Sequence, residues 1–139
     1  MQTYRASLSR GLGAVRQARR AVIDFAAQCG FDDGILDDVE SAVGEALANA
    51  AEHGNTAGGF DVSAIFENER LVIEVRDHGG GFDCGAALER ANTPDAAGNR
   101  GFGIFLMRTL MDEVAFSDRG SCIQLVKRLG DRTAVPSAR

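Results

Sequence analysis

Three polar side chains stand at steps of four residues within a run of alanines: Glu45, Asn49 and His53. In an α-helix a step of four residues turns only about 40° around the axis, so the three would form one slanting stripe. The stripe runs beside Ala42 at the edge of the apolar face, where a polar group must border a cleft or find a partner. A carboxylate there could orient or deprotonate an attacking hydroxyl, and the Asn49 amide oxygen could ligate Mg²⁺. Taken singly, such residues more often form a partly exposed helix flank.

A second stretch, Asp77-His78-Gly79-Gly80-Gly81, places a carboxylate and three glycines at the end of an apolar strand. Asp77 could accept a hydrogen bond from an exocyclic amine such as that of adenine. The glycines would let a flat ring approach the backbone, because no Cβ intervenes. The alternative is a plain turn from strand to loop.

A third stretch, Gly98-Asn99-Arg100-Gly101-Phe102-Gly103, puts glycines at the expected start of a helix. Backbone N–H groups at such a start are free to hold phosphate oxygens, and Arg100 adds a cation. A mobile loop ahead of an ordinary helix is the alternative. Two common phosphate-binding fingerprints, GxxxxGK[ST] and GxGxxG, are absent from the sequence.

The hydrophobic pattern predicts the elements that must position these stretches. Apolar residues recur at helical spacing over residues 14–29 and 34–53, with Gly30 to stop the first helix and Asp32-Asp33 to cap the second. A third helix opens at Gly101 and carries Val114 on its inner face. The strand at residues 71–75 is mostly apolar, so we expect it at the centre of the sheet. The other expected strands cover residues 3–8, 60–66, 113–117 and 122–129, with hairpin turns at 67–70 and 118–120.

The composition fits one globular domain, because the 139 residues are 45% hydrophobic and 25% charged. We expect that domain over residues 1–130 and a disordered tail over residues 131–139. A net charge of −5 argues against a general nucleic-acid binder. No run approaches the ~20 apolar residues that span a bilayer, and no secretory signal opens the chain, so we expect a cytoplasmic protein. The three cysteines form no CxxC pair, which speaks against a zinc site or a disulfide framework: Cys29, Cys84 and Cys122.

Taken together, the three stretches resemble the nucleotide-binding boxes of the GHKL (Bergerat-fold) ATPases. Residues 45–53, Glu-Ala-Leu-Ala-Asn-Ala-Ala-Glu-His, resemble the N box. Residues 77–83, Asp-His-Gly-Gly-Gly-Phe-Asp, are similar to the first glycine box, DxGxG, and residues 100–112 are similar to the second. Order and spacing match as well, and the resemblance extends over roughly residues 4–129. The branch that the chain resembles most is the stand-alone anti-sigma-factor serine/threonine kinases of bacterial partner-switching systems.

The resemblance implies an α+β fold, a two-layer sandwich in which helices cover one face of a mixed, mostly antiparallel sheet. It implies ATP and Mg²⁺ as ligands, held under a mobile lid drawn from Asp83 to Asn99. By motif match, Asp77 would bind the adenine amine, Asn49 would ligate Mg²⁺ and Glu45 would be the catalytic carboxylate.

The same match assigns further residues to the nucleotide site. Two groups of glycines would shape the adenine pocket and contact the phosphates, and Ser121 stands where the family usually has the threonine of a Gly-Thr pair. Ser121 therefore either substitutes for that threonine or makes a weaker contact. The residues assigned in this way are His53, Gly79, Gly81, Phe82, Arg100, Gly101, Phe102, Gly103 and Ser121.

The branch implies a protein serine/threonine kinase that is also an anti-sigma factor. It would phosphorylate a small STAS-domain antagonist and sequester a sigma factor or an equivalent target, as a homodimer that binds neither nucleic acid nor a membrane. Three alternatives stay open: a nucleotide-gated binding module with little transferase activity, a detached catalytic domain of a histidine kinase, and a fold relic without nucleotide. The second fits less well, because Glu52 stands where sensor histidine kinases commonly carry a lysine.

Charge is also unevenly distributed near the N-terminus. Arginines come first and acids follow, at Arg5, Arg10, Arg16, Arg19 and Arg20 and then at Asp32, Asp33, Asp37, Asp38 and Glu40. A solvated helix face is the usual meaning of such a pattern. The alternative is a docking surface for an acidic partner. Charge reversal at Arg16 and Arg20 that left all partner binding unchanged would exclude it.

Overall fold

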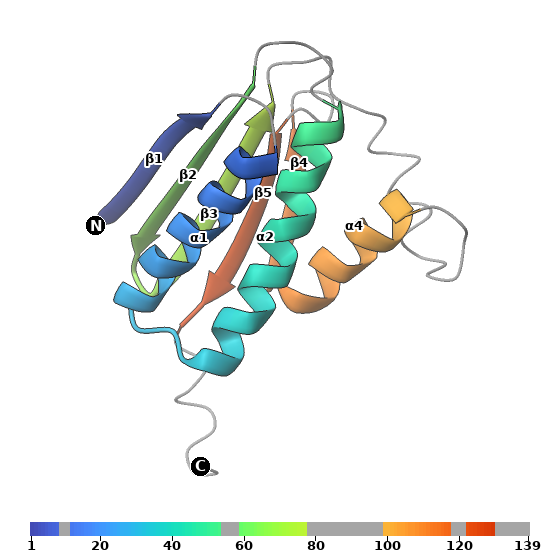
Figure 1. Cartoon of the computed structure of the whole chain (residues 1–139). Helices are drawn as coiled ribbons and strands as arrows, with labels where there is room; N and C mark the ends of the chain where they lie inside the picture. Colours follow the sequence, from blue (N-terminus) through green and yellow to red (C-terminus); the bar gives the residue numbers. More distant parts are fainter. Residues whose placement is uncertain (9–11, 54–58, 78–98, 118–121, 130–139) are drawn as a thin grey trace.

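The computed structural model describes residues 1–8, 12–53, 59–77, 99–117 and 122–129, and places them in two layers. One layer is a five-stranded sheet in the order β1-β2-β3-β5-β4, and every strand pairing among these residues is antiparallel. Helices cover one face of the sheet (Figure 1), which confirms the α+β sandwich expected from the sequence. The strands are β1 (Gln2–Leu8), β2 (Phe60–Glu67), β3 (Arg70–Asp77), β4 (Glu113–Ser117) and β5 (Cys122–Arg128). The helices are α1 (Leu12–Gln28), α2 (Asp33–His53) and α4 (Asn99–Leu110).

The boundary between α1 and α2 follows from two residue types. Gly30 follows α1 with a φ of 109°, a backbone conformation that other residues rarely adopt. The Asp32 carboxylate accepts a hydrogen bond from Ile35 N at 3.0 Å and so caps the first turn of α2. Both helices then turn their apolar stripes toward the sheet, where small residues such as Ala18 and Ala42 are fully buried and allow close packing.

The β2–β3 hairpin determines which way Asp77 faces. Its turn residues, 68–69, have positive φ values of 56° and 60°, as a two-residue hairpin turn requires. Side chains alternate along β3 from that turn, and Asp77 pairs with the fully buried Phe60. Asp77 thus continues the buried, helix-facing row of β3, which consists of Leu71, Ile73 and Val75. The central position expected for this strand is confirmed.

The third helix, α4, ends at Leu110, before the strand that the sequence predicts over residues 113–117. Val114, which we also expected on the inner face of this helix, lies on β4, so the strand prediction is confirmed and the helical one is wrong. The helical pattern fails there because Asp112 N donates to Val126 O of β5 at 2.9 Å, which commits the chain to strand pairing. Lys127 Nζ donates to Leu110 O at 2.7 Å and satisfies a carbonyl at the end of the helix. These contacts tie the C-terminal end of α4 to β5.

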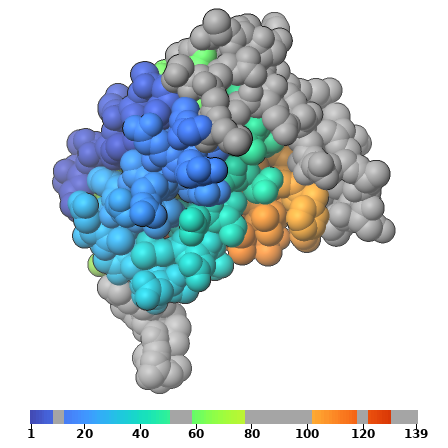
Figure 2. Space-filling model, in the orientation of Figure 1, coloured from blue at the N-terminus to red at the C-terminus, as the bar shows by residue number. Residues whose placement is uncertain are grey.

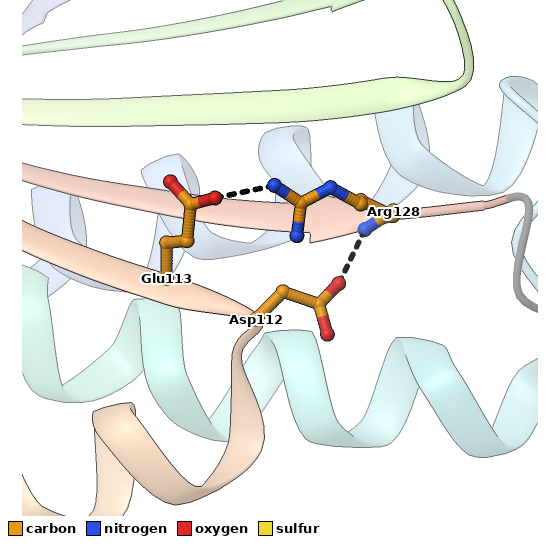
Figure 3. Close-up of polar contacts among 3 residues, drawn as sticks. All are labelled: Asp112, Glu113 and Arg128. Atoms are coloured by element: carbon orange, nitrogen blue, oxygen red, sulfur yellow. Dashed lines mark hydrogen bonds and ion pairs between the residues drawn. The ribbon is translucent and has the colours of Figure 1, made fainter.

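Two neighbouring acids hold Arg128 in different ways (Figure 3). Asp112 Oδ2 accepts a hydrogen bond from Arg128 N at 2.6 Å, whereas Glu113 forms an exposed ion pair with the guanidinium. We expect Asp112→Ala to lower the free energy of unfolding by about 1 kcal/mol, and Tm by roughly 3 °C, because a backbone donor loses its partner. Glu113→Ala should cost less than about 0.5 kcal/mol, because exposed ion pairs are screened by solvent. Thermal unfolding measures both, and equal losses would contradict this assignment.

The helix-covered face is seen in Figure 2, in the orientation of Figure 1, where atoms of α1, α2 and α4 hide most of the sheet. No helix in the described ranges is long and apolar enough to cross a membrane. The lid expected from Asp83 to Asn99 lies outside the described residues except for Asn99, and the tail expected at residues 131–139 lies outside them entirely.

Candidate functional site

Helix α2 brings Glu45 and Asn49 to the inner side of the molecule. Glu45 is half-buried, and Asn49 is only 6% exposed although it is polar. The neighbouring Ala42 and Ala46 belong to the core, so the polar stripe does lie along the edge of the apolar face. His53 is the last residue of α2, and the prediction for its side chain lies outside the described part of the chain.

The Asn49 side chain carries a buried donor that has no partner among the described residues. Its Nδ2 atom is out of contact with solvent and makes no hydrogen bond within that part of the chain. Nearly all buried polar atoms in proteins are paired, and leaving one unpaired costs about 1–3 kcal/mol. A polar ligand beside α2 would remove this cost. Because an asparagine amide carries an oxygen as well as a nitrogen, the same side chain could offer a ligand of the type that Mg²⁺ prefers.

The Asp77 carboxylate is buried at the end of β3, with an exposed fraction of 6%. A buried aspartate is rare in proteins unless its oxygens accept hydrogen bonds. β3 delivers it to the layer between sheet and helices, and α2 packs against β3 there. Its position agrees with a role in recognising a donor group of a ligand. Gly79, Gly81 and Phe82, which were predicted beside it, lie outside the described residues.

Two of the predicted stretches meet at the start of α4. Gly103 is buried, and a Cβ placed on it would lie 3.4 Å from Glu45 Cδ and closer still to Glu45 Oε1. The glycine and the carboxylate are 58 residues apart in sequence, so only the packing of α4 on α2 brings them together.

The remaining predicted residues of this region are only partly described. Phe102 is 50% exposed, and its ring centre lies 6.3 Å from that of Phe105 on the same helix. Arg100 and Gly101 lie in the first turn of α4, while the surroundings of their side-chain positions fall outside the described part. Ser121 falls outside it as well.

The described groups form a chemically coherent set on three adjoining elements. α2 packs against both β3 and α4, and Figure 1 shows β3 and α2 ending at the same end of the molecule. The first backbone N–H groups of any helix have no partner within the helix, so the start of α4 favours an anion. Together with a buried acceptor, an amide oxygen and a carboxylate, this chemistry suits a ligand that carries phosphates and a ring with an amine.

Other chemistries find less support in the described ranges. No group of three or more His, Cys, Asp or Glu side chains there could hold a metal ion. Burial raises the pKa of the Cys29 thiol, so that thiol stays protonated near neutral pH and is not an activated nucleophile. A polar depression of about 400 Å³ lies on the other face of the sheet, among residues that include Arg5, Asp61 and Arg76. It contains none of the predicted site residues.

Only some of the charged side chains on the first two helices pair with one another. Arg19 Nε lies 3.8 Å from Glu40 Oε2, so one arginine of α1 faces an acid of α2. Arg16 and Arg20 are exposed. The docking surface therefore stays a prediction.

Sequence reasoning missed the features that hold α4 in place. The fit of Gly103 against Glu45 was not predicted, although the paired glycines at the start of the helix were a signal for close approach. The hydrogen bond from Lys127 to the end of α4 was missed too. The signal that could have found it is the position of this cation in the helix-facing row of β5, after the buried Ile123 and Leu125.

The chain resembles known proteins over most of its length. The family model described as histidine kinase-like ATPase domain matches residues 8–127. The serine-protein kinase RsbW of Listeria monocytogenes is 26% identical over 135 residues, which covers 90% of this chain and 86% of that protein. RsbW of Bacillus licheniformis is 32% identical over 134 residues, covering 84% and 83%. An anti-sigma F factor of Thermoanaerobacter is 32% identical over 120 residues, covering 81% and 84%.

A solved structure shares the fold. It contains the RsbU and RsbW domains of Rv1364c from Mycobacterium tuberculosis, and it aligns with a TM-score of 0.68 at 21% identity. The alignment covers 93% of this chain and 33% of that chain, so this chain spans about a third of its length.

Proposed function

Because this chain belongs to the histidine kinase-like ATPase family, we propose that it is an ATP-dependent protein serine/threonine kinase and anti-sigma factor. Relatives named serine-protein kinase and anti-sigma F factor support this role. The proposed substrate is a serine or threonine of a small STAS-domain antagonist, and the proposed second partner is a sigma factor or an equivalent target. The chain would act as a homodimer, which light scattering of the purified protein tests.

The proposed roles combine the motif match with the positions of the described residues. Asp77 accepts a hydrogen bond from the adenine amine. Asn49, whose buried Nδ2 atom has no hydrogen-bond partner among the described residues, would hold Mg²⁺ through its oxygen. The start of α4, with Arg100, holds phosphate oxygens. The metal ion, when bound, neutralises charge on the phosphates. Glu45 accepts the hydroxyl proton as the substrate oxygen bonds to the γ-phosphorus and the bond to ADP breaks.

The observation that favours a kinase over a binding module is the position of Glu45. Its carboxylate lies half-buried against α4, near the end that would hold phosphates. A negative charge there repels an anionic ligand, so it does not serve affinity. It does serve proton transfer, because a general base must lie beside the transferred group.

The chemical form of the product separates the kinase from its alternatives. We expect incubation with the STAS-domain antagonist, ATP and Mg²⁺ to yield an acid-stable phosphoester on a serine or threonine of the antagonist. An acid-labile phosphoramidate would indicate a histidine kinase domain instead. Partner affinity that changes between ADP and ATP without any transfer would indicate a nucleotide-gated binding module.

Asn49→Leu is expected to separate stability from binding. Leucine has a similar volume and removes the unpaired donor, so the ligand-free protein should gain about 1 kcal/mol and its Tm should rise by roughly 3 °C. Magnesium-dependent affinity for ATP should fall by at least about tenfold, because an oxygen ligand is lost. Thermal unfolding without ligand and calorimetry with Mg²⁺–ATP measure the two effects. Unchanged affinity would remove Asn49 from the metal site.

A further inference from the structure

We propose that Gly103 is a positioning residue for the Glu45 carboxylate, because the missing side chain at residue 103 leaves the space that this carboxylate fills. A Cβ on Gly103 would lie closer to Glu45 Oε1 than real Cβ atoms come to other heavy atoms. It would lie 3.4 Å from Glu45 Cδ and 3.8 Å from Cγ. The catalytic consequence rests on the proposed role of Glu45. The contact itself is present in the ligand-free protein.

The backbone does not account for a glycine at this position. Gly103 lies within α4, and its φ is outside the left-handed region that requires glycine, unlike that of Gly30. Inside a helix, glycine is less favourable than alanine, because it loses more conformational freedom on folding. The space taken by the carboxylate is therefore the reason to have a glycine there.

α4 cannot easily move away to make room for a side chain. Its next residue, Ile104, and Met107 one turn later are fully buried in the core. Its C-terminal end is tied to β5 by the hydrogen bond from Lys127 to Leu110 O. Asp112, two residues after the helix, accepts a hydrogen bond from Arg128 N of β5 (Figure 3). The side chain of Glu45, in contrast, has several rotatable bonds. A methyl group at residue 103 would therefore displace the carboxylate and leave the helix in place.

The first test needs no nucleotide. We expect Gly103→Ala to raise Tm by roughly 3 °C in a Glu45→Ala background, where only helix propensity changes, and to give little or no rise in the wild type. Gly44→Ala is the matched control, because a Cβ there would meet Arg19 at ordinary distances of 3.5 and 3.7 Å. Its effect on Tm should be the same in both backgrounds. The proposal would be overturned if Gly103→Ala raised Tm by the same amount in both backgrounds.

The second test uses the kinase reaction and a rescue. Gly103→Ala should lower kcat by about 100-fold, the typical effect of misplacing a reacting group by 1 Å. The shorter carboxylate of Glu45→Asp should slow the wild type but speed up Gly103→Ala, because it avoids the added methyl group. A purely structural role of Gly103 would not make the effect of Glu45→Asp on the rate change sign. If Glu45→Asp slowed both proteins, the proposal would be overturned.

The two proposals fail in different ways. Suppose that Glu45→Gln transfers phosphate normally while the effect of Gly103→Ala on Tm still differs between the wild type and Glu45→Ala. Then the role of Glu45 as base is wrong and the contact stands. If Glu45→Gln is inactive while Gly103→Ala keeps full kcat, the positioning role is wrong and the base stands.

Discussion

Glu45→Gln is expected to slow phosphate transfer to the antagonist by about 10³-fold, within the range that general-base catalysis contributes. Glutamine keeps the shape of the side chain beside Gly103 but cannot accept the hydroxyl proton. ADP affinity should stay the same or rise, because the substitution removes a negative charge near the phosphates. Single-turnover phosphorylation at saturating ATP measures the rate, and calorimetry with ADP measures the affinity.

The matched control is Glu40→Gln on the same helix. Glu40 is exposed and its side chain pairs with Arg19, so this variant should transfer phosphate at close to the wild-type rate. Normal phosphorylation by Glu45→Gln would rule out Glu45 as the base. A loss shared by both variants would instead point to a general effect of charge on α2.

Asp77→Asn is expected to weaken ATP binding by about 10- to 150-fold. A hydrogen bond to a charged group contributes about 1.5–3 kcal/mol, and each 1.4 kcal/mol is a factor of ten in affinity. Asparagine keeps the volume at this buried position, so the helix-facing row of β3 should remain packed. Calorimetry with Mg²⁺–ATP measures the loss, and circular dichroism checks the fold.

Guanine nucleotides provide the control for Asp77. Guanine presents a carbonyl oxygen where adenine presents its amine, and an asparagine amide can donate to that oxygen while a carboxylate cannot. Asp77→Asn should therefore narrow the preference for ATP over GTP. Equal losses for both nucleotides would mean that Asp77 acts through the fold and does not read the base.

Most secondary structure could be predicted from local patterns. The helix over residues 34–53, the hairpin turn at 67–70 and the strand at 113–117 all agree with the structure to within a residue or so. These elements depend on neighbours a few residues apart: an aspartate cap, a glycine stop, or alternation of apolar side chains. Val114 fitted two patterns, the helical spacing that continues past Leu110 and the strand over residues 113–117, and pairing with a distant strand, β5, decided for the strand.

The candidate site was predicted as a list of residue types but not as an arrangement. The residues near Glu45 and Asp77 in sequence already indicated a polar stripe on a helix and a carboxylate at the end of a buried strand. The paired glycines at the start of α4 and the cation at residue 127 were local signals, but neither names its partner: only the structure shows that Gly103 packs against Glu45 of α2 and that Lys127 holds the C-terminal end of α4.

The amino-acid sequence by itself determined where the elements form and which chemistry they carry, because propensity, capping and hydrophobic period act over a few residues. The tertiary structure alone decided that Asp77 faces the helices and that Glu45 fills the space beside Gly103. It also decided that the buried Asn49 Nδ2 atom has no hydrogen-bond partner among the described residues. These depend on burial and on contacts between residues far apart in the chain, which exist only once the layers have packed.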